Sequence, residues 1–294
     1  MTQSRLNRRD IIGSGIAAGL FAATSLPAHA SPKRGGVLRL VLPSEPRAIE
    51  DQILASGLLF QQLTQVLPNG ALAPELATRW RADKSAKIWT FDLREDVSFH
   101  NGSIMSADTA ITAFRTGGFA QKRQGFSNGI VAVRKNGPFG LTFELNRADP
   151  DFPYRLASPE FSVQGPQPLV GTGLYRHLES APERMMFERV NRHWKGEACG
   201  WFDRLEVLTS GSQDARREAL EIGRVDVAVD IGADFLAPKS RLEIAPFALS
   251  TAVDPTLDAR KIFVGISKRI QRPHTEDQLP AQHQFRWAER WWRA

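Results

Sequence analysis

The amino-acid sequence predicts an α/β fold with mixed sheets, because strand-like and helix-like segments alternate along it. Short apolar runs at 37–42 and 225–229 indicate buried strands. At 88–93 and 141–145 apolar and polar residues alternate, which is typical of half-buried antiparallel strands. Helix-like segments separate these strands, so neither an all-β nor an all-α class fits.

The first half of the chain begins with the strand-like run 37–42, which lies between two glycines and a proline. From Asp51 to Leu67 apolar residues recur at helical spacing before Pro68, Asn69 and Gly70, which predicts a helix. Ser106 is a candidate N-cap for a helix that continues to Phe114. The Gly-rich, basic stretch 117–136 predicts a mobile loop.

The second half contains strand-like runs and one further helix. The Pro- and Gly-rich stretch 158–173 predicts a crossover between subdomains. A helix is predicted from Gln213 to Ile222, with Gly223 as its C-cap. Strands are predicted at 175–178, 184–189, 205–208 and 225–229.

The first thirty residues have the pattern of a signal peptide. Three arginines precede the apolar run Ile11–Leu26, and Ala28-His29-Ala30 has the small-x-small form of a cleavage site, which predicts cleavage after Ala30. The run has sixteen residues against the roughly twenty that span a bilayer, so an uncleaved anchor is the less favoured alternative. Asn7–Ile12 resembles a twin-arginine export signal.

Composition and charge exclude several classes of protein. The chain has 294 residues, of which 42% are hydrophobic and 24% charged, as in ordinary globular proteins. Loss of residues 1–30 removes three arginines and one aspartate, which changes the formal charge from +6 to +4. Because the cations are scattered among acidic residues, the sequence predicts no binding of nucleic acid. The single cysteine, Cys199, excludes an intrachain disulfide and is interpreted as a small apolar residue rather than a nucleophile.

The sequence contains no motif that would support catalysis. It has no Gly-x-Ser-x-Gly elbow, no His-Glu-x-x-His, no phosphate-binding loop and no close Cys/His group. We therefore predict a protein that is not an enzyme, with no catalytic residues, no metal site and no cofactor.

Several motifs in series resemble the family-5 extracellular solute-binding proteins, the peptide- and nickel-binding receptors of ABC transporters. The most specific motif is Trp89–Gly102, which resembles the pattern "tFkLRxgvxFHdG" of that family. The other motifs, which together with it extend over about 33–230, are 33–39, 72–80, 106–110, 171–175 and 219–226. The resemblance implies a periplasmic binding protein-like (type II) fold.

The resemblance also implies a domain organisation. Residues 31–50 together with 165–255 are expected to form the first lobe, and 51–164 an inserted subdomain of it. Segment 257–270 resembles the helix with which the family's second lobe begins. Residues 256–294 are therefore expected to be a vestigial second-lobe helix with a Trp/Arg-rich tail, and the C-terminal lobe to be largely missing.

Ligand contacts are implied by the resemblance in three places. The expected ligand-binding residues are Ser44, Glu45, Pro46, His193, Trp194, Asp230 and Gly232. For Glu45 a solvated loop position is an alternative, and for Trp194 packing in the core. His100, at an Asn-Gly turn, is interpreted as structural rather than as a metal ligand.

The tail is open to two interpretations. Trp287 and Trp291 lie four residues apart and would share one face of a helix. That face covers apolar surface which a second lobe would otherwise bury, or it contacts a partner or membrane surface through Trp287, Trp291 and Trp292.

The resemblance implies a periplasmic, non-catalytic receptor that binds a small peptide or related solute and presents it to an ABC-transporter permease. A receptor that closes two lobes on its ligand gains affinity by excluding water from both sides. Because the second lobe is expected to be largely missing here, the alternative is a degenerate family member that acts as a protein-interaction module without binding a ligand.

Overall fold

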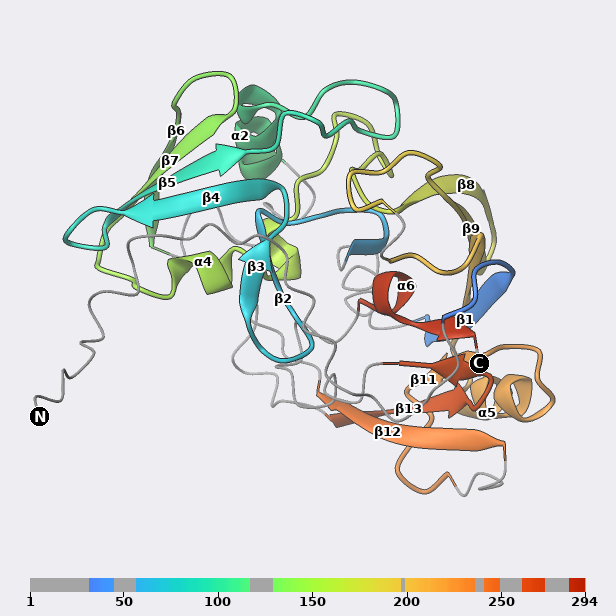
Figure 1. The fold of residues 1–294 in the computed structure, drawn as a ribbon. Coiled ribbons are helices and arrows are strands. Elements are labelled where there is room, and N and C mark those ends of the chain that lie inside the picture. The colour runs from blue at the N-terminus through green and yellow to red at the C-terminus, as the bar shows by residue number, and fades with distance from the viewer. Residues whose placement is uncertain are drawn as a thin grey trace, which may run out of the picture. The chain divides into compact units, whose positions relative to one another are not determined.

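The computed structural model describes residues 32–44, 57–116, 129–196, 199–235, 241–248, 261–272 and 286–293 (Figure 1). By its internal contacts the chain divides into Met1–Ser31 and Pro32–Ala294, and all described residues belong to the second unit. The predicted signal peptide therefore lies outside the described residues. Among the helices that are described, none is long and apolar enough to cross a membrane.

A seven-stranded mixed sheet has β1 (Val37–Pro43) at its centre. β1 is parallel to β10 and β11, and the other pairings in this sheet are antiparallel. The strand order is β12 (Leu242–Ala248), β13 (Lys261–Ser267), β11 (Val227–Val229), β1, β10 (Arg204–Ser210), β9 (Arg184–Arg189), β8 (Tyr175–Ala181).

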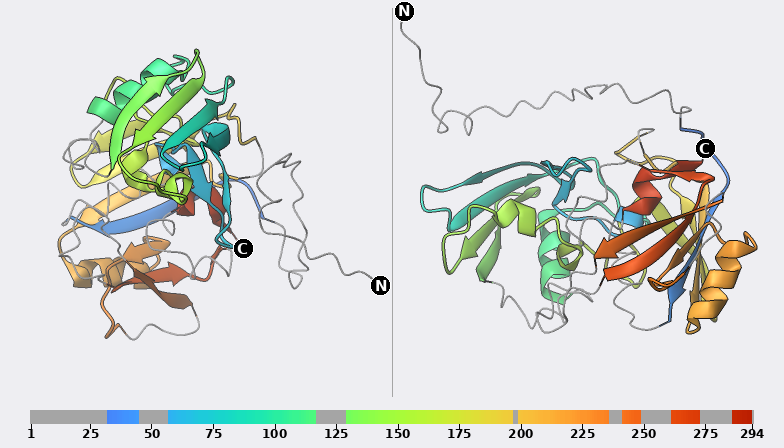
Figure 2. Two further views of the ribbon diagram at one scale, coloured as in Figure 1. Left: turned by 90° about the vertical axis from the view of Figure 1, so that its left-hand side faces the viewer. Right: turned by 90° about the horizontal axis from the view of Figure 1, so that it is seen from below.

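Helix α5 (Gln213–Glu221) connects β10 to β11 and so crosses over β1. Ser212 caps its amino end by accepting a hydrogen bond from the backbone N–H of Ala215. Gly223 follows its carboxyl end with a φ of +74°, a left-handed conformation that often terminates helices. The helix contacts β11, β13, β1 and β10, so it covers one face of the sheet (Figure 2). On that face Leu220 packs with Val41 of β1, while Leu38, Leu40 and Leu42 lie in a separate core cluster.

A four-stranded antiparallel sheet has its own core. Its order is β4 (Ala77–Ala82), β5 (Ile88–Leu93), β7 (Gly140–Leu145), β6 (Ile130–Lys135), and it is accompanied by helices α2 (Ala107–Thr116) and α4 (Phe152–Arg155). The predicted alternation of β5 is confirmed, because Trp89, Phe91 and Leu93 are buried. Phe143 lies edge-on to Phe91 at 5.4 Å and to Phe152 at 5.2 Å, which locks the sheet to α4.

Shorter elements complete the described fold. The small pairings are β2 (Thr64–Val66) with β3 (Leu72–Pro74), and β14 (Ile270–Gln271) with β15 (Trp292–Arg293); the short helices are η2 (Pro159–Phe161) and α6 (Trp287–Arg290). The seven-stranded sheet draws six strands from the two parts of the expected first lobe and β13 from the expected second-lobe remnant, and the four-stranded sheet lies within the expected inserted subdomain. Since the contacts group Pro32–Ala294 as one unit, that division stays a prediction.

Three sequence-based assignments are wrong in their described parts. The predicted helix 51–67 is irregular from Leu59 and then forms β2. Its apolar residues are buried in irregular structure and in a strand, so their helical spacing did not indicate a helix. The predicted loop 117–136 contains β6, whose Ile130 and Val133 are buried. The expected second-lobe helix 257–270 contains β13, where β-branched residues at every second position pair with β11 and β12.

The C-terminal segment, which we define as residues 286–293, packs into the fold. Trp291 follows α6 and is fully buried in the core cluster that contains Leu38 and Leu40 of β1. The prediction of partner or membrane contact is therefore wrong for Trp291, because its side chain is not at the surface. Trp292 is partly buried and belongs to β15, so it does not continue a helical face either.

Candidate functional site

The carboxyl ends of three parallel strands meet at one edge of the seven-stranded sheet. β1 ends at Pro43, β10 at Ser210 and β11 at Val229, and the connection through α5 places β10 and β11 on opposite sides of β1. Where strand order divides in this way, a crevice forms outside the carboxyl ends, and ligands bind there in open α/β sheets. We call this place the strand-end site.

Two of the residues expected to bind ligand are joined at the strand-end site by Arg216. The backbone N–H of Ser44 donates to the carbonyl of Ser210 at 3.3 Å, and Arg216 Nη1 donates to the same oxygen at 2.8 Å. Arg216 Nε donates to Val229 O at 2.9 Å, and Nη2 to Asp230 O at 2.7 Å. Arg216 is only 3% exposed, so it acts as an internal tie between strand ends rather than as a ligand contact.

Asp230 holds an unusual backbone conformation at this edge. Its φ is +57°, in the left-handed region that non-glycine residues seldom adopt, and Gly232 follows with a φ of +80°. Such strain persists where the surrounding structure enforces it, and it is frequent at ligand sites. The Asp230 side chain is 19% exposed and its Oδ2 lies 3.4 Å from Arg216 Nη2. The carboxylate is thus positioned by a buried cation while part of it faces outward.

The remaining polar groups of the strand-end site come from α5 and the chain after β11. Gln213 Nε2 donates to Asp230 O at 3.2 Å, and Arg217 donates to Ile231 O at 2.6 Å and to Asp234 at 2.5 Å. The amino end of α5 adds a partial positive charge. Glu45 and Pro46, also expected here, lie outside the described residues. The arrangement can hold a polar solute through hydrogen bonds and charge.

His193 and Trp194 lie at a different place from Ser44, Asp230 and Gly232. His193 Nε2 donates to Thr172 O at 2.9 Å, and its Nδ1 accepts from the backbone N–H of Lys195 at 3.1 Å. Burial lowers the pKa of His193 to about 4, so the ring is neutral near pH 7. His100 is held in the same manner, with Nε2 against Gly173 O at 2.9 Å, which agrees with a structural role.

Trp194 is engaged in packing and hydrogen bonding. Its Nε1 donates to Gln61 Oε1 at 3.1 Å, and the Arg94 guanidinium lies 3.9 Å from the centre of its ring. A pocket of about 440 Å³ opens beside His193 and Trp194, and Asp96, Arg176 and Arg192 contribute to its lining. That volume suits a small molecule. His193 and Trp194 therefore border a pocket, although their own polar atoms bond within the protein.

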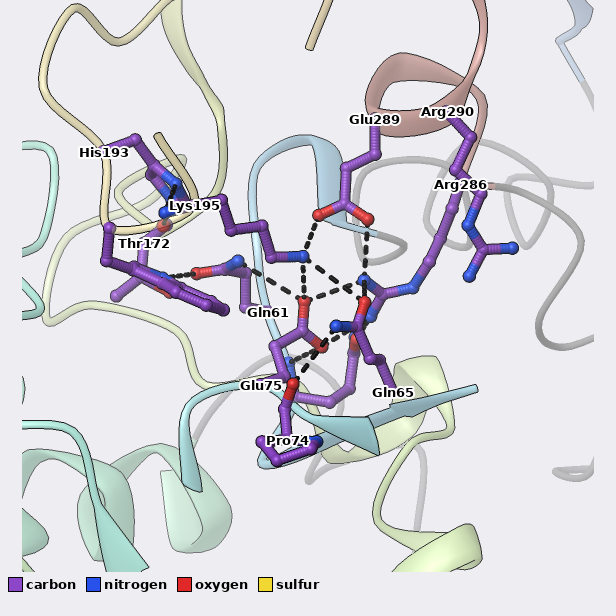
Figure 3. Close-up of polar contacts among 12 residues, drawn as sticks. Gln61, Gln65, Pro74, Glu75, Thr172, His193, Lys195, Arg286, Glu289 and Arg290 are labelled. Atoms are coloured by element: carbon purple, nitrogen blue, oxygen red, sulfur yellow. Dashed lines mark hydrogen bonds and ion pairs between the residues drawn. The ribbon is translucent and has the colours of Figure 1, made fainter. Parts of the chain in front are cut away.

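A cluster of four charged residues is buried around Lys195, the residue that follows Trp194 in the chain (Figure 3). This buried charge cluster consists of Glu75, Lys195, Arg286 and Glu289, each with a side chain at most 8% exposed. Arg286 forms a two-pronged contact with Glu75, at 2.6 and 2.7 Å, and Lys195 Nζ lies 2.9 Å from Glu75 Oε1. Lys195 and Arg286 also contact Glu289. Two carboxylates thus balance two cations.

The protonation of the cluster follows from this pairing. Burial alone would raise the pKa of Glu289, but Lys195 and Arg286 outweigh it and lower that pKa to about 2. The pKa of Glu75 is lowered in the same way, mainly by Arg286 and Lys195 against the effect of burial. Both carboxylates are therefore ionised at neutral pH.

Sequence reasoning missed both Arg216 and the buried charge cluster. Arg216 was visible only as half of an Arg-Arg pair, and the cluster joins residues more than two hundred positions apart. In the part of the chain that the structure describes, no group of three or more His, Cys, Asp or Glu residues could hold a metal ion. Burial raises the pKa of Cys199 to about 12, so its thiol is protonated at neutral pH.

Comparison with known proteins gives this fold a family. The family model described as "Bacterial extracellular solute-binding proteins, family 5 Middle" matches residues 71–266. A nickel-binding periplasmic protein of Escherichia coli (strain K12) is 28% identical over 194 residues, which cover 60% of this chain and 37% of that protein.

Solved structures agree on the fold. A nickel ABC transporter protein of Bacillus halodurans matches with a TM-score of 0.61 and 20% identity, over 74% of this chain and 48% of that one. A periplasmic binding protein of Helicobacter pylori, solved with the peptide STSA, matches with a TM-score of 0.61 and 17% identity, over 73% of this chain and 51% of that one. The predicted periplasmic binding protein-like fold is confirmed, and the chain spans about half the length of these structures. Since the family model matches well over half of the chain, the protein belongs to the bacterial extracellular solute-binding proteins, family 5.

Proposed function

We propose that this protein is a non-catalytic receptor that binds a small peptide or related solute outside the cytoplasm and presents it to an ABC-transporter permease. Membership of family 5 supports the receptor role. Relatives are described as a nickel-binding periplasmic protein and as a periplasmic binding protein in complex with a peptide, which supports peptides and nickel complexes as the classes of solute to test.

The observation that carries the proposal is the partly exposed carboxylate of Asp230 at the strand-end site. Arg216 fixes it from inside, and its backbone holds a left-handed φ of +57°. In this proposal Asp230 accepts hydrogen bonds from a cationic group of the solute, such as the amino group of a peptide. Ser44, which follows β1, lies at the same strand ends, where its backbone N–H donates to Ser210 O.

The proposed compartment is the periplasm. The charged and apolar pattern of residues 1–30 supports export and cleavage after Ala30, and the family is extracellular by description. Amino-terminal sequencing of the protein recovered from a periplasmic fraction tests this. The expected result is a chain that begins at Ser31.

A thermal-shift screen with pools of di- to pentapeptides and with nickel chelates tests solute binding, because a ligand that binds the folded state raises the melting temperature. One pool is expected to raise it in a concentration-dependent manner. Asp230→Asn is expected to weaken the affinity about tenfold, as for loss of one charged hydrogen bond, so that about ten times more peptide is needed for the same rise in melting temperature. Glu179→Gln, an exposed carboxylate on β8, is the matched control and is expected to leave it unchanged.

Failure has a definite meaning in this screen. A cooperative melt that no pool shifts would reject the receptor proposal and favour the alternative, a protein-interaction module without ligand binding. A response that Asp230→Asn leaves intact would keep the receptor but remove the strand-end site from it.

A further inference from the structure

The buried charge cluster joins two parts of the chain that are far apart in sequence (Figure 3). Gln62, Gln65, Glu75 and Lys195 belong to the body of the fold, whereas Arg286 and Glu289 belong to the C-terminal segment. The body offers one buried anion and one buried cation, and the segment offers one of each in return. Each half therefore presents the charges that the other half needs.

The body recognises Arg286 through both terminal nitrogens of its guanidinium group. Glu75 accepts from Nη1 at 2.7 Å and from Nη2 at 2.6 Å. Gln62 Oε1 accepts from Nη2 at 2.5 Å and Gln65 Oε1 from Nη1 at 3.3 Å. Planar, two-pronged recognition of this kind selects Arg over Lys, whose ammonium is a point charge.

Glu289 is recognised in a similarly specific way. Lys195 contacts its Oε1, and its backbone carbonyl accepts from the N–H of Gly200 at 2.9 Å. Gly57 leaves room for the carboxylate, because a Cβ at that position would lie 2.9 Å from Glu289 Cδ. The space for Glu289 is thus shaped by backbone as well as by charge.

The rest of the C-terminal segment binds as a peptide would. Arg290 Nη2 donates to Val66 O at 2.5 Å, and Trp291 fills a fully buried position. Trp292 and Arg293 then add a short antiparallel strand to β14. Arg293 also forms an isolated antiparallel β-bridge with Lys33 through the backbone. Side-chain anchors followed by strand addition are a common mode of peptide recognition.

We propose that Gln62, Gln65, Glu75 and Lys195 form a segment-binding site for a peptide that presents Arg and, three residues later, Glu, and that residues 286–293 of the same chain occupy it. The site is distinct from the strand-end site, so this inference goes beyond the proposed solute receptor. A peptide without the Arg leaves the Glu75 carboxylate buried beside a single cation, and this is the source of selectivity.

The test uses the full chain with a protease recognition sequence inserted between residues 280 and 281. After cleavage, the C-terminal fragment is expected to stay with the body through gel filtration. Excess synthetic peptide Phe-Arg-Trp-Ala-Glu-Arg-Trp-Trp-Arg-Ala, the sequence of residues 285–294, is expected to replace it. The matched control peptide exchanges the Arg and Glu at positions 286 and 289, which keeps composition and net charge, and it is expected to compete at least tenfold less well.

Three results would overturn the proposal. The first is a fragment that separates at once from a folded body, and the second is equal competition by the two peptides. The third is a cleaved chain that has lost its cooperative thermal transition and does not regain it when peptide is added. Light scattering of the uncleaved chain checks that the segment binds within its own molecule. A dimer that dissociates when the 285–294 peptide is added would show exchange between copies and would contradict occupation in cis.

Discussion

At the scale of single residues, Glu75 is the group on which the buried charge cluster depends most. Replacement by Gln leaves Arg286 and Lys195 to share Glu289 in a buried environment. We expect Glu75→Gln to lower the free energy of unfolding by about 3–5 kcal/mol, as for other broken buried ion pairs. Denaturation in urea measures this loss.

A surface pair provides the control for Glu75. Glu144 contacts Arg134 at 2.7 Å, but both side chains are well exposed. Glu144→Gln is therefore expected to cost less than about 1 kcal/mol. Equal losses in the two variants would contradict the dependence of the buried charge cluster on Glu75.

His193 predicts how stability changes with pH. Its pKa is about 4 in the folded protein, because burial disfavours the charged ring, against about 6.5 in the unfolded chain. The unfolded state therefore binds more protons below pH 6.5, and stability falls as the pH is lowered from 6.5 to 4. The contribution of His193 to this loss is on the order of 3 kcal/mol.

Matched variants isolate that contribution in urea titrations at several pH values. His193→Gln is expected to flatten the dependence of stability on pH between 6.5 and 4. His177→Gln, at a half-buried position where the ring contacts Ser180 Oγ and lies edge-on to Phe187, is expected to retain it. Identical slopes in both variants would show that His193 is not the titrating group.

The sequence could predict some of these residues but not their partners. His100 at its turn follows from local signals, since an Asn-Gly turn and a neighbouring aromatic core are visible in the sequence. Arg286 and Glu75 carry no such signal, because an isolated charge in a sequence is normally solvated. Their burial follows only from tertiary packing of segments that no local rule connects.

At the scale of elements, prediction succeeded where one face of a strand is buried and the other is not. β5 and β7 alternate clearly, and α2 and α5 carry capping residues. It failed for β13, where resemblance to a helix of the family outweighed the alternation of Ile262, Val264 and Ile266. A central strand buried between two neighbours and a helix that is apolar all round are hard to separate by periodicity.

Arg216 is expected to be as important to the ends of β10 and β11 as any apolar side chain. Arg216→Met keeps the length of the side chain but removes the donors to Ser210, Val229 and Asp230. Since hydrogen bonds to a charged group each contribute about 1.5–3 kcal/mol, we expect the loss of these donors to cost at least about 2 kcal/mol in urea denaturation. Ser212→Ala, which removes only the cap of α5, is the comparison and is expected to cost about 1 kcal/mol. A smaller loss for Arg216→Met than for Ser212→Ala would contradict the role of Arg216 as a tie between strands.

At the scale of the whole molecule, the two ends of the described chain meet in one core. Trp291 packs in the same cluster as Leu38 and Leu40 of β1, and Lys33 forms a backbone β-bridge with Arg293. The chain spans only about half of its structural neighbours, yet the residues that are described bury a continuous core around β1.

Because the two ends share a core, a substitution near residue 290 is expected to destabilise the structure near residue 40. Trp291→Ala removes a fully buried indole and is expected to cost about 3–5 kcal/mol, or on the order of 10 °C in melting temperature. Hydrogen exchange is expected to show faster exchange in β1, although β1 lies some 250 positions away in sequence. Trp80→Ala, at a partly buried position on β4, is the comparison and is expected to affect β4 and β5 more than β1. If Trp291→Ala accelerated exchange only in residues 286–293, the C-terminal segment would be an appended element, and the shared core would not be the unit that unfolds.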